Sequence, residues 1–258
     1  MFNTDIYKQK LSTSILGHKF IYAESIGSTN DEIWNTEHGN HNGLVLVAEE
    51  QTKGRGRSGH TWFSSINKSL TFSILVNLST VKINNGFIPI STGLAVCKTI
   101  NDSIVDKVSI KWPNDVLVND KKICGILCET KMIGTNQFMV IGLGININQL
   151  SGDFPLSIVD NVTSLAIAQK SKASREMFLA TLLSNIESSL FKEDFLNTKK
   201  RWDHYCDHID KDISFHQGNR KFYGIFSGIN RNGEAIIRIN NKLNIFSSGV
   251  IEYENTSS

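Results

Sequence analysis

Glycine-spaced arginines at residues 54–59 are the first feature whose residue types could do chemistry. Gly54-Arg55-Gly56-Arg57-Ser58-Gly59 matches a G-x-G-x-x-G pattern, but a dinucleotide site needs a strand before that pattern and a helix after it. Here Trp62 and Phe63 lead into an alternating strand pattern, and no VAIK, HRD or DFG element of a kinase follows. Glycine lets the backbone approach a ligand, and arginine donates paired hydrogen bonds to phosphate or carboxylate. The segment is therefore typical of a loop that closes over an anion or, with equal weight, of a solvated basic loop.

A strand pattern at residues 141–148 combines glycines with amides. Period two places the isoleucines and Leu143 on one face, where they can fill a core. The other face carries Gly142, Gly144, Asn146 and Asn148. A flat floor beside two amides suits a heterocycle such as a nucleobase. The alternative is a strand covered by a closely packed helix.

Two lysines accompany a second polar cluster. Lys111-Trp112-Pro113-Asn114-Asp115 gathers polar groups around a proline turn, and Lys122 precedes the apolar run at residues 123–127. A lysine that enters an apolar strand is a candidate anion contact. The alternative is a strand-edge charge that discourages pairing with another strand.

The elements that must position these residues follow from hydrophobic periodicity. Strands are predicted at residues 44–48, 70–76, 108–111, 115–118, 122–129 and 138–147. Helices are predicted from Ser28 to a break at residues 40–43, with a capping box at Thr29 and Glu32, and at residues 87–104, 162–169 and 174–207. From Ile209 onward, short strands around turns replace the helices. The pattern predicts an α+β domain at residues 1–208 and a small all-β domain at residues 209–258.

The composition limits the class of protein. The chain has 258 residues, 40% hydrophobic and 20% charged, which is typical of a globular protein with a well-formed core. Its 27 basic and 25 acidic residues give a net charge of +2, which favours neither a DNA nor a membrane partner. No apolar run approaches the roughly 18–20 residues of a membrane span, and the N-terminus lacks a secretion signal. Four cysteines without a metal-ligand spacing indicate free thiols and a cytoplasmic location.

Six motifs, taken together in chain order, resemble the biotin–protein ligases (the BirA and holocarboxylase synthetase family). They are Ser28-Thr29-Asn30; Gln51 with Gly54-Arg55-Gly56-Arg57; Trp62-Phe63-Ser64; Lys111-Trp112-Pro113-Asn114-Asp115; Lys122 with Gly125-Ile126-Leu127 and Glu129; and Gly142-Leu143-Gly144-Ile145-Asn146. The resemblance extends from about residue 20 to the C-terminus. It implies a mixed β-sheet with helices on one face, related to class II aminoacyl-tRNA synthetases, followed by a small SH3-like β-barrel.

The resemblance also implies a reaction. Biotin and Mg²⁺-ATP would give biotinyl-5′-AMP and pyrophosphate. The ε-amine of one lysine on a biotin carboxyl carrier protein or domain, as in acetyl-CoA carboxylase, would then take the biotin and release AMP. The resemblance leaves the Mg²⁺ ligands and the choice between monomer and homodimer open. The segment Ser247–Tyr253 lacks the arginine common there in the family, so no ATP contact is assigned to the C-terminal domain.

The resemblance assigns roles to residues of this chain. Those implied to bind biotin are Ser28, Thr29, Asn30, Gln51, Gly54, Arg55, Gly56, Arg57, Lys122 and Gly125. Those implied to bind ATP or the adenylate are Arg55, Trp62, Asn114, Lys122, Gly142, Gly144, Ile145 and Asn146. The implied catalytic residues are Lys122, Arg57, Lys111 and Asp115. Among them, Lys122 would hold the carboxylate and α-phosphate together. Asp115 would orient Lys111 or the incoming amine, and the alternative is a contribution to a metal site.

Three alternative functions are considered. A lipoate or octanoate ligase would share the fold, although the GRGR loop and the KWPND cluster favour biotin. A carrier-binding module without catalysis is disfavoured by Lys122, Arg55 and Arg57. A DNA-binding repressor would need a winged helix, and only about 20 residues precede the first motif.

Overall fold

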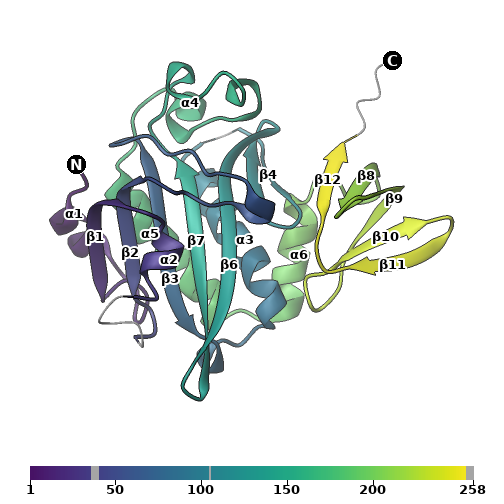
Figure 1. Ribbon diagram of the computed structural model, residues 1–258, viewed down its shortest axis with the longest axis horizontal. Helices are drawn as coiled ribbons and strands as arrows, with labels where there is room; N and C mark the ends of the chain where they lie inside the picture. The colour runs from purple at the N-terminus through teal and green to yellow at the C-terminus, as the bar shows by residue number, and fades with distance from the viewer. Residues whose placement is uncertain (36–40, 105, 254–258) are drawn as a thin grey trace.

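The computed structural model describes residues 1–35, 41–104 and 106–253, whose strands form two sheets (Figure 1). The larger sheet has seven strands in the order β1-β2-β3-β7-β6-β5-β4, and the smaller has five in the order β11-β10-β9-β8-β12. The strands of the larger sheet are β1 (Phe20–Ile26), β2 (Val45–Gln51), β3 (Ser69–Asn77), β4 (Val108–Lys111), β5 (Asp115–Val118), β6 (Lys121–Ile133) and β7 (Asn136–Asn146). The predicted α+β class and mixed sheet are confirmed.

The pairing of β3, β7 and β6 positions the glycine pattern of residues 142–144 at the centre of the larger sheet. Here β1 and β2 are parallel, and the other neighbouring pairs are antiparallel. The register places Gly144 between Thr71 and Gly125, and Gly142 between Ser73 and Leu127. Because side chains alternate between the two faces of a strand, these rows share the face opposite the apolar core.

Helices accompany this sheet, and the long ones cover its other face. They are α1 (Thr4–Lys10), α2 (Thr29–Glu32), α3 (Ile88–Asn101), α4 (Leu165–Gln169), α5 (Arg175–Phe191) and α6 (Phe195–Tyr205). In Figure 1, α3, α5 and α6 lie behind the sheet, and the short α2 lies in front of it. The main core fills the space between the sheet and α3 and α5. The predicted placement of the long helices on one face is confirmed.

Several predicted boundaries were wrong. The single helix predicted at residues 174–207 is interrupted, because Asp194 accepts a hydrogen bond from the Asn197 N–H and starts α6 anew. The helix predicted from Ser28 ends at Glu32, and residue 40 of its predicted break lies outside the described residues. Its capping box is absent too, since Gln51 Oε1 accepts the Thr29 N–H instead. Both α1 and β1 had been missed.

The smaller sheet is antiparallel throughout. It contains β8 (Asp212–Gln217), β9 (Arg220–Ile229), β10 (Ala235–Ile239), β11 (Lys242–Phe246) and β12 (Val250–Tyr253). Its turn before β10 contacts the larger unit, where the Trp112 indole donates a hydrogen bond of 2.9 Å to Gly233 O. Asn84 Nδ2 also donates to Asn232 Oδ1 at 3.2 Å. The domain boundary at residue 208 stays a prediction.

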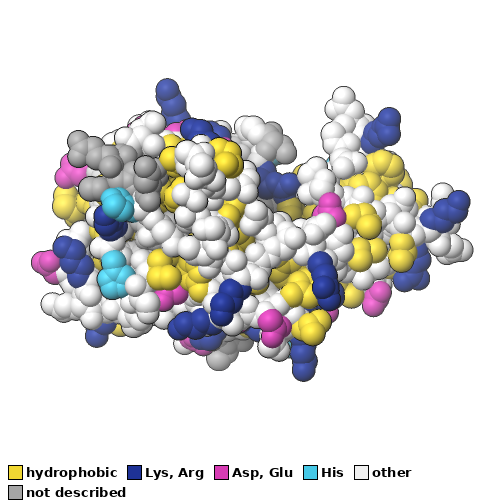
Figure 2. Space-filling model, turned by 90° about the horizontal axis from the view of Figure 1, so that it is seen from below, with side chains coloured by type: hydrophobic (Ala, Val, Ile, Leu, Met, Phe, Trp, Pro, Cys, Tyr) yellow, Lys and Arg dark blue, Asp and Glu magenta, His cyan; other side chains and the backbone are white. Residues whose placement is uncertain are grey.

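The charged side chains of the surface and the state of the cysteines can be compared with the expectations from composition. Figure 2 shows Lys and Arg side chains scattered among Asp and Glu on the face seen from below. No helix within the described residues is long and apolar enough to cross a membrane. All four cysteines are free, and three of them are buried.

Candidate active site

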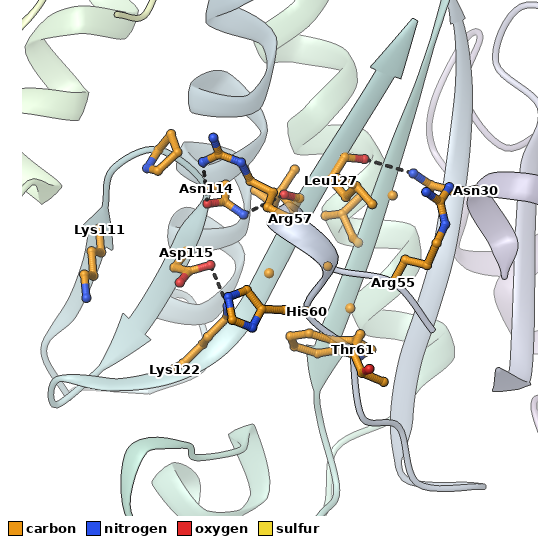
Figure 3. Close-up of a pocket in the computed structure, with 18 of the residues that line it drawn as sticks. Asn30, Arg55, Arg57, His60, Thr61, Lys111, Asn114, Asp115, Lys122 and Leu127 are labelled. Carbon is orange, nitrogen blue, oxygen red and sulfur yellow. Dashed lines mark hydrogen bonds and ion pairs between the residues drawn. The ribbon is translucent and has the colours of Figure 1, made fainter. Parts of the chain in front are cut away.

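A cavity of about 340 Å³ opens on the front face of the larger sheet, beside the smaller one (Figure 3). Strands β6 and β7 form its floor, and the loop at residues 55–62 lies over it. The turn between β4 and β5 forms one wall. Residues 249–251, at the start of β12, complete the lining. The cavity therefore draws on both sheets.

Most of the predicted site residues line this cavity. They are Ser28, Thr29, Asn30, Gln51, Arg55, Gly56, Arg57, Trp62, Lys111, Asn114, Asp115, Lys122, Gly125, Gly142 and Gly144. Three predicted residues are not among the lining residues: Gly54, Ile145 and Asn146. The sequence motifs are thus brought together from six separate segments of the chain, whereas the individual roles stay predictions.

One end of the cavity is a network of buried hydroxyl and amide groups. Gln51 Oε1 accepts hydrogen bonds from Thr29 N at 2.8 Å and from Thr29 Oγ1 at 3.1 Å. Ser73 Oγ lies 2.8 Å from Thr29 Oγ1 and 2.7 Å from Asn30 Oδ1. The Asn30 amide donates to Leu127 O at 3.2 Å and to Glu129 Oε2 at 2.7 Å. Since each group is held by another, this end is a rigid polar surface.

Cations and one carboxylate gather at the opposite end. Lys122 Nζ forms an ion pair with Asp115 Oδ1 at 2.7 Å, and Arg57 Nη1 donates to Asn114 Oδ1 at 3.3 Å (Figure 3). Burial lowers the pKa of Arg57, and the Asp115 carboxylate opposes that shift. Burial also lowers the pKa of Lys111, again against the pull of Asp115. Asp115 is thus paired with Lys122 and also acts electrostatically on Lys111, and its predicted role in orienting Lys111 or the incoming amine stays a prediction.

The loop arginines differ in their surroundings. Arg55 Nη2 lies 2.6 Å from Asp31 Oδ1 and 2.9 Å from Glu129 Oε2. Its guanidinium therefore contacts two carboxylates, whereas that of Arg57 lies in the cationic end of the cavity. The loop that carries both arginines, residues 54–62, is a small hairpin. In it, Gly56 N donates to His60 O and Trp62 N donates to Gly54 O.

The predicted open glycine floor is covered by side chains. A Cβ on Gly144 would overlap the Trp62 indole, and one on Gly142 would overlap the Asn30 amide. A Cβ on Gly125 would lie 3.0 Å from Trp62 Cζ3. The glycines thus make room for Trp62 and Asn30, and a nucleobase would have to meet the indole rather than bare backbone. The alternative, a strand covered by a closely packed helix, agrees with the cover of Gly142, because Asn30 belongs to α2, whereas Gly144 is covered by Trp62 of the loop.

Asn146, Ile145 and Gly54 serve the scaffold around the cavity. Asn146 is 4% exposed; its Nδ2 donates to Thr163 O at 2.9 Å, and its Oδ1 accepts from Gln149 Nε2 at 3.0 Å. Ile145 belongs to the apolar core. Gly54 packs against the Trp62 carbonyl. The predicted adenine contact of Asn146 is therefore not brought to the cavity, because both ends of its amide are bound elsewhere.

Other residues of the site had no assigned role. Ser73 and Glu129 fix Asn30, but a serine within an apolar strand carries no signal of its own. Gly249, Val250 and Ile251 line the cavity, although no contact had been assigned to the C-terminal unit. The position of Glu129 could have been inferred from the sequence. It follows Gly125 and Leu127 at intervals of two residues, so its side chain lies on the same face of the strand.

No group of three or more His, Cys, Asp or Glu residues that could hold a metal ion occurs within the described ranges. In the cavity, Asp115 is the carboxylate nearest the cations, and it is paired with Lys122. Mg²⁺ is commonly held by one or two carboxylates together with substrate phosphates. The donor set therefore fits a metal ion that is carried mainly by the nucleotide.

Comparison with known proteins gives consistent results. A family model described as the biotin/lipoate A/B protein ligase family matches residues 22–146. The bifunctional ligase/repressor BirA of Bacillus subtilis is 29% identical over 247 residues, covering 94% of this chain and 76% of that protein. The BirA of Bacillus spizizenii is 30% identical over 232 residues, covering 88% of this chain and 71% of that protein.

A solved structure extends the likeness over both sheets. Biotin protein ligase from Aquifex aeolicus, in complex with biotin and ATP, superposes with a TM-score of 0.78 and 27% identity, covering 91% of this chain and 98% of that one. The motifs, the cavity and these likenesses all agree. The chain belongs to the biotin/lipoate A/B protein ligase family, and within it to the biotin–protein ligases.

Proposed function

We propose that this chain activates biotin with ATP and transfers it to a lysine of a biotin carboxyl carrier protein or domain. First, a carboxylate oxygen of biotin bonds to the α-phosphorus of ATP, the bond to the β-phosphate breaks, and pyrophosphate leaves. Next, the lysine amine bonds to the acyl carbon of biotinyl-5′-AMP, AMP leaves, and the amine gives up a proton. The Aquifex relative was solved with biotin and ATP, which supports both substrates.

The observation that carries the proposal is the polarity of the cavity. One end offers the fixed hydroxyl and amide groups of Thr29, Asn30 and Gln51, which match the donors and acceptor of a ureido ring. The other end offers Lys122 and Arg57, which match a carboxylate beside a phosphate. An elongated ligand with a polar ring and an anionic tail would bind both ends at once.

The ion pair suggests how Lys122 acts. Asp115 holds Nζ in one place, so the ammonium needs no reorganisation when negative charge builds up between carboxylate and phosphate. Mg²⁺ bound to the phosphates would neutralise part of the same charge. In the second step, the loop over the cavity would keep water from the acyl-adenylate until the amine arrives.

The same polarity favours biotin over lipoate. The dithiolane ring of lipoate has no N–H or C=O group, so it would leave Asn30 and Gln51 facing an apolar group. A site built to hydrogen-bond its substrate discriminates strongly against an analogue that lacks those groups. For the acceptor, the Mycobacterium tuberculosis relative is named biotin--[acetyl-CoA-carboxylase] ligase, and it is 31% identical over 58% of this chain. That name supports a carboxylase carrier domain.

An intact-mass assay tests the proposal. A purified apo carrier domain is incubated with this protein, Mg²⁺-ATP and either biotin or lipoate. We expect one biotin adduct that requires ATP and no lipoate adduct. A lipoate adduct would overturn the substrate, and no adduct from a folded protein that still binds biotin would support a carrier-binding module instead. A carrier with its lysine replaced by arginine is the matched control.

A further inference from the structure

Glu129 connects two parts of the site that the motifs treat separately. It lies on β6, on the same face as Gly125 and Leu127, and its side chain is 34% exposed. One carboxylate oxygen, Oε2, lies 2.7 Å from Asn30 Nδ2 and 2.9 Å from Arg55 Nη2. The other oxygen lies 3.1 Å from the same Arg55 nitrogen. A single carboxylate thus contacts both the polar end of the cavity and the loop above it.

The contact with Asn30 fixes the direction of a buried amide. Asn30 is 3% exposed, its Oδ1 lies 2.7 Å from Ser73 Oγ, and its Nδ2 is shared between Leu127 O and Glu129. An acceptor at the Nδ2 end keeps Oδ1 and Nδ2 from exchanging places, because the reversed amide would turn its oxygen toward two other oxygens. Glu129 therefore determines which edge of Asn30 a ligand meets.

The contact with Arg55 compensates the charge of that side chain. Asp31 and Glu129 both lie within 3 Å of Arg55 Nη2. By contrast, Arg57 donates to a neutral amide oxygen of Asn114 and lies among Lys111, Asp115 and Lys122. The two arginines of the loop therefore have different surroundings, and only Arg57 is directed to the anion-binding end.

We infer that Glu129 is a positioning residue that joins the biotin-ring end of the cavity to the loop at residues 54–62. It orients the Asn30 amide that would contact the ring, and it holds Arg55 and with it the loop over the cavity. Arg55 then acts as the anchor of the loop, and Arg57 acts as its contact with the adenylate. This inference rests on the proposed function for its substrate.

Four variants separate the contact of Glu129 with Asn30 from its contact with Arg55. Glu129→Gln keeps an acceptor for Asn30 but removes one of the two carboxylate charges that contact Arg55; Glu129→Ala removes both contacts of Glu129. Arg55→Gln and the double variant Arg55→Gln/Glu129→Gln complete a thermodynamic cycle. Asp102→Asn, which breaks an exposed Lys98–Asp102 pair on α3, is the control for loss of a surface ion pair.

Two measurements do not depend on turnover. Biotin affinity is measured by calorimetry, and hydrogen exchange is followed at Gly56 N and Trp62 N, which are bonded within the loop hairpin. We expect Glu129→Gln to bind biotin within about twofold of wild type and Glu129→Ala to bind about tenfold more weakly. Loop exchange should rise several-fold in Arg55→Gln and by less in Glu129→Gln, where Asp31 still contacts Arg55, and the double variant should match Arg55→Gln alone.

Turnover adds a third measurement, the release of biotinyl-AMP. It should rise together with loop exchange in Glu129→Gln, Arg55→Gln and the double variant, while the KM for ATP stays within about twofold of wild type. Multiplying effects in the double variant would show that Arg55 and Glu129 act independently, and a higher KM for ATP from Arg55→Gln alone would show that Arg55 contacts the nucleotide. Either result would overturn the inference. Equal loss of biotin affinity in Glu129→Gln and Glu129→Ala would overturn the inference that Glu129 orients the Asn30 amide. Failure of wild-type biotin transfer would instead refute the proposed function, with the loop exchange still interpretable.

Discussion

Lys122 and Asp115 show how one ion pair can prepare a cavity for an anion. Each side chain is partly exposed, and the pair lies between the Arg57 loop and the turn at residues 111–115. A lysine alone would be a flexible point charge, but the carboxylate confines its ammonium to one position. In the proposed reaction, the pair would supply a cation that is in place before the substrates react.

Lys122→Ala should abolish most adenylate formation. Removing one pre-organised charge contact typically lowers a rate by about 10²–10³-fold, and we expect biotin-dependent pyrophosphate release to fall by at least that range. Lys121→Ala is the matched control, because Lys121 is exposed and lies outside the cavity lining. Near-normal pyrophosphate release from a folded Lys122→Ala protein would contradict the role.

The sequence indicates the residue types of the site better than their contacts. The place of Thr29, Gln51, Arg57 and Lys122 at the cavity could be predicted, because polar and cationic side chains of these types suit a binding site whatever the detailed packing. Asn146 could not, since only the fold reveals that Thr163 and Gln149 occupy its amide. Hydrogen bonds between side chains and distant segments, such as those of Asn146, depend on how the strands pair. No local pattern of residues encodes that pairing.

At the scale of elements, the loop over the cavity is a hairpin with fixed ends. Its start is tied to β1, where Thr52 N donates to Ile26 O and Lys53 N donates to Gly27 O. Its end is tied by Asn67 N, which donates to Glu49 Oε1 at 2.6 Å. Between these ties the loop is held mainly by side chains, so single substitutions should change how well it covers the cavity.

Arg57→Gly should release biotinyl-AMP into solution. The variant loses the loop's contact with Asn114 and the cation expected to face the adenylate. We expect several-fold more biotin on lysines of an unrelated bystander protein, measured by blotting with labelled streptavidin. Arg220→Gly, at the exposed start of β9, is the control. An unchanged bystander signal would show that Arg57 does not retain the intermediate.

Gly144→Ala should displace Trp62. The added methyl group would overlap the indole, and such overpacking costs about 1–3 kcal/mol. We expect a lower denaturation midpoint in urea and weaker ATP binding. Gly152→Ala is the control, since a Cβ there meets nothing within 4 Å and the backbone is not left-handed. Equal midpoints for the two variants would show that Trp62 does not depend on Gly144.

Elements with a buried alternating face were the most predictable. Strands β4 and β5 lie at the residues predicted, because each is a short and mostly buried run between two turns. The extension of β6 to Ile133 was missed, since its last residues are largely exposed and need no apolar pattern. The break before α6 was missed because Lys192 and Glu193 suit a helix interior, and only the capping by Asp194 reveals the end.

The molecule as a whole depends on contacts between its N-terminal segment and α5. Glu187 accepts hydrogen bonds from the backbone N–H groups of Ser14, Ile15 and Leu16, at 2.7, 2.8 and 2.9 Å. Burial alone would raise the pKa of Glu187, but these three donors lower it below its ordinary value. Its ionised form is therefore bound more strongly in the folded state than in the unfolded one.

Glu187→Gln should lower the free energy of unfolding at neutral pH by about 1–3 kcal/mol. Because the folded-state pKa is depressed, the wild-type contribution is full above the ordinary pKa and is lost as the pH falls through the folded-state value. The difference between wild type and variant, measured by urea titration at several pH values, should shrink below about pH 4. A difference that is constant with pH would show that ionised Glu187 is not the source.

The contribution of residues 249–251 to the cavity has a consequence for protein synthesis. Residues 28–30 leave the ribosome early, whereas the strand that completes the lining is translated after β11. A nascent chain can therefore build the larger sheet before its cavity has all its walls. Ligand affinity would then increase at a late point of translation, and a ribosome-bound chain arrested before β12 should bind biotinyl-AMP less tightly than the released protein.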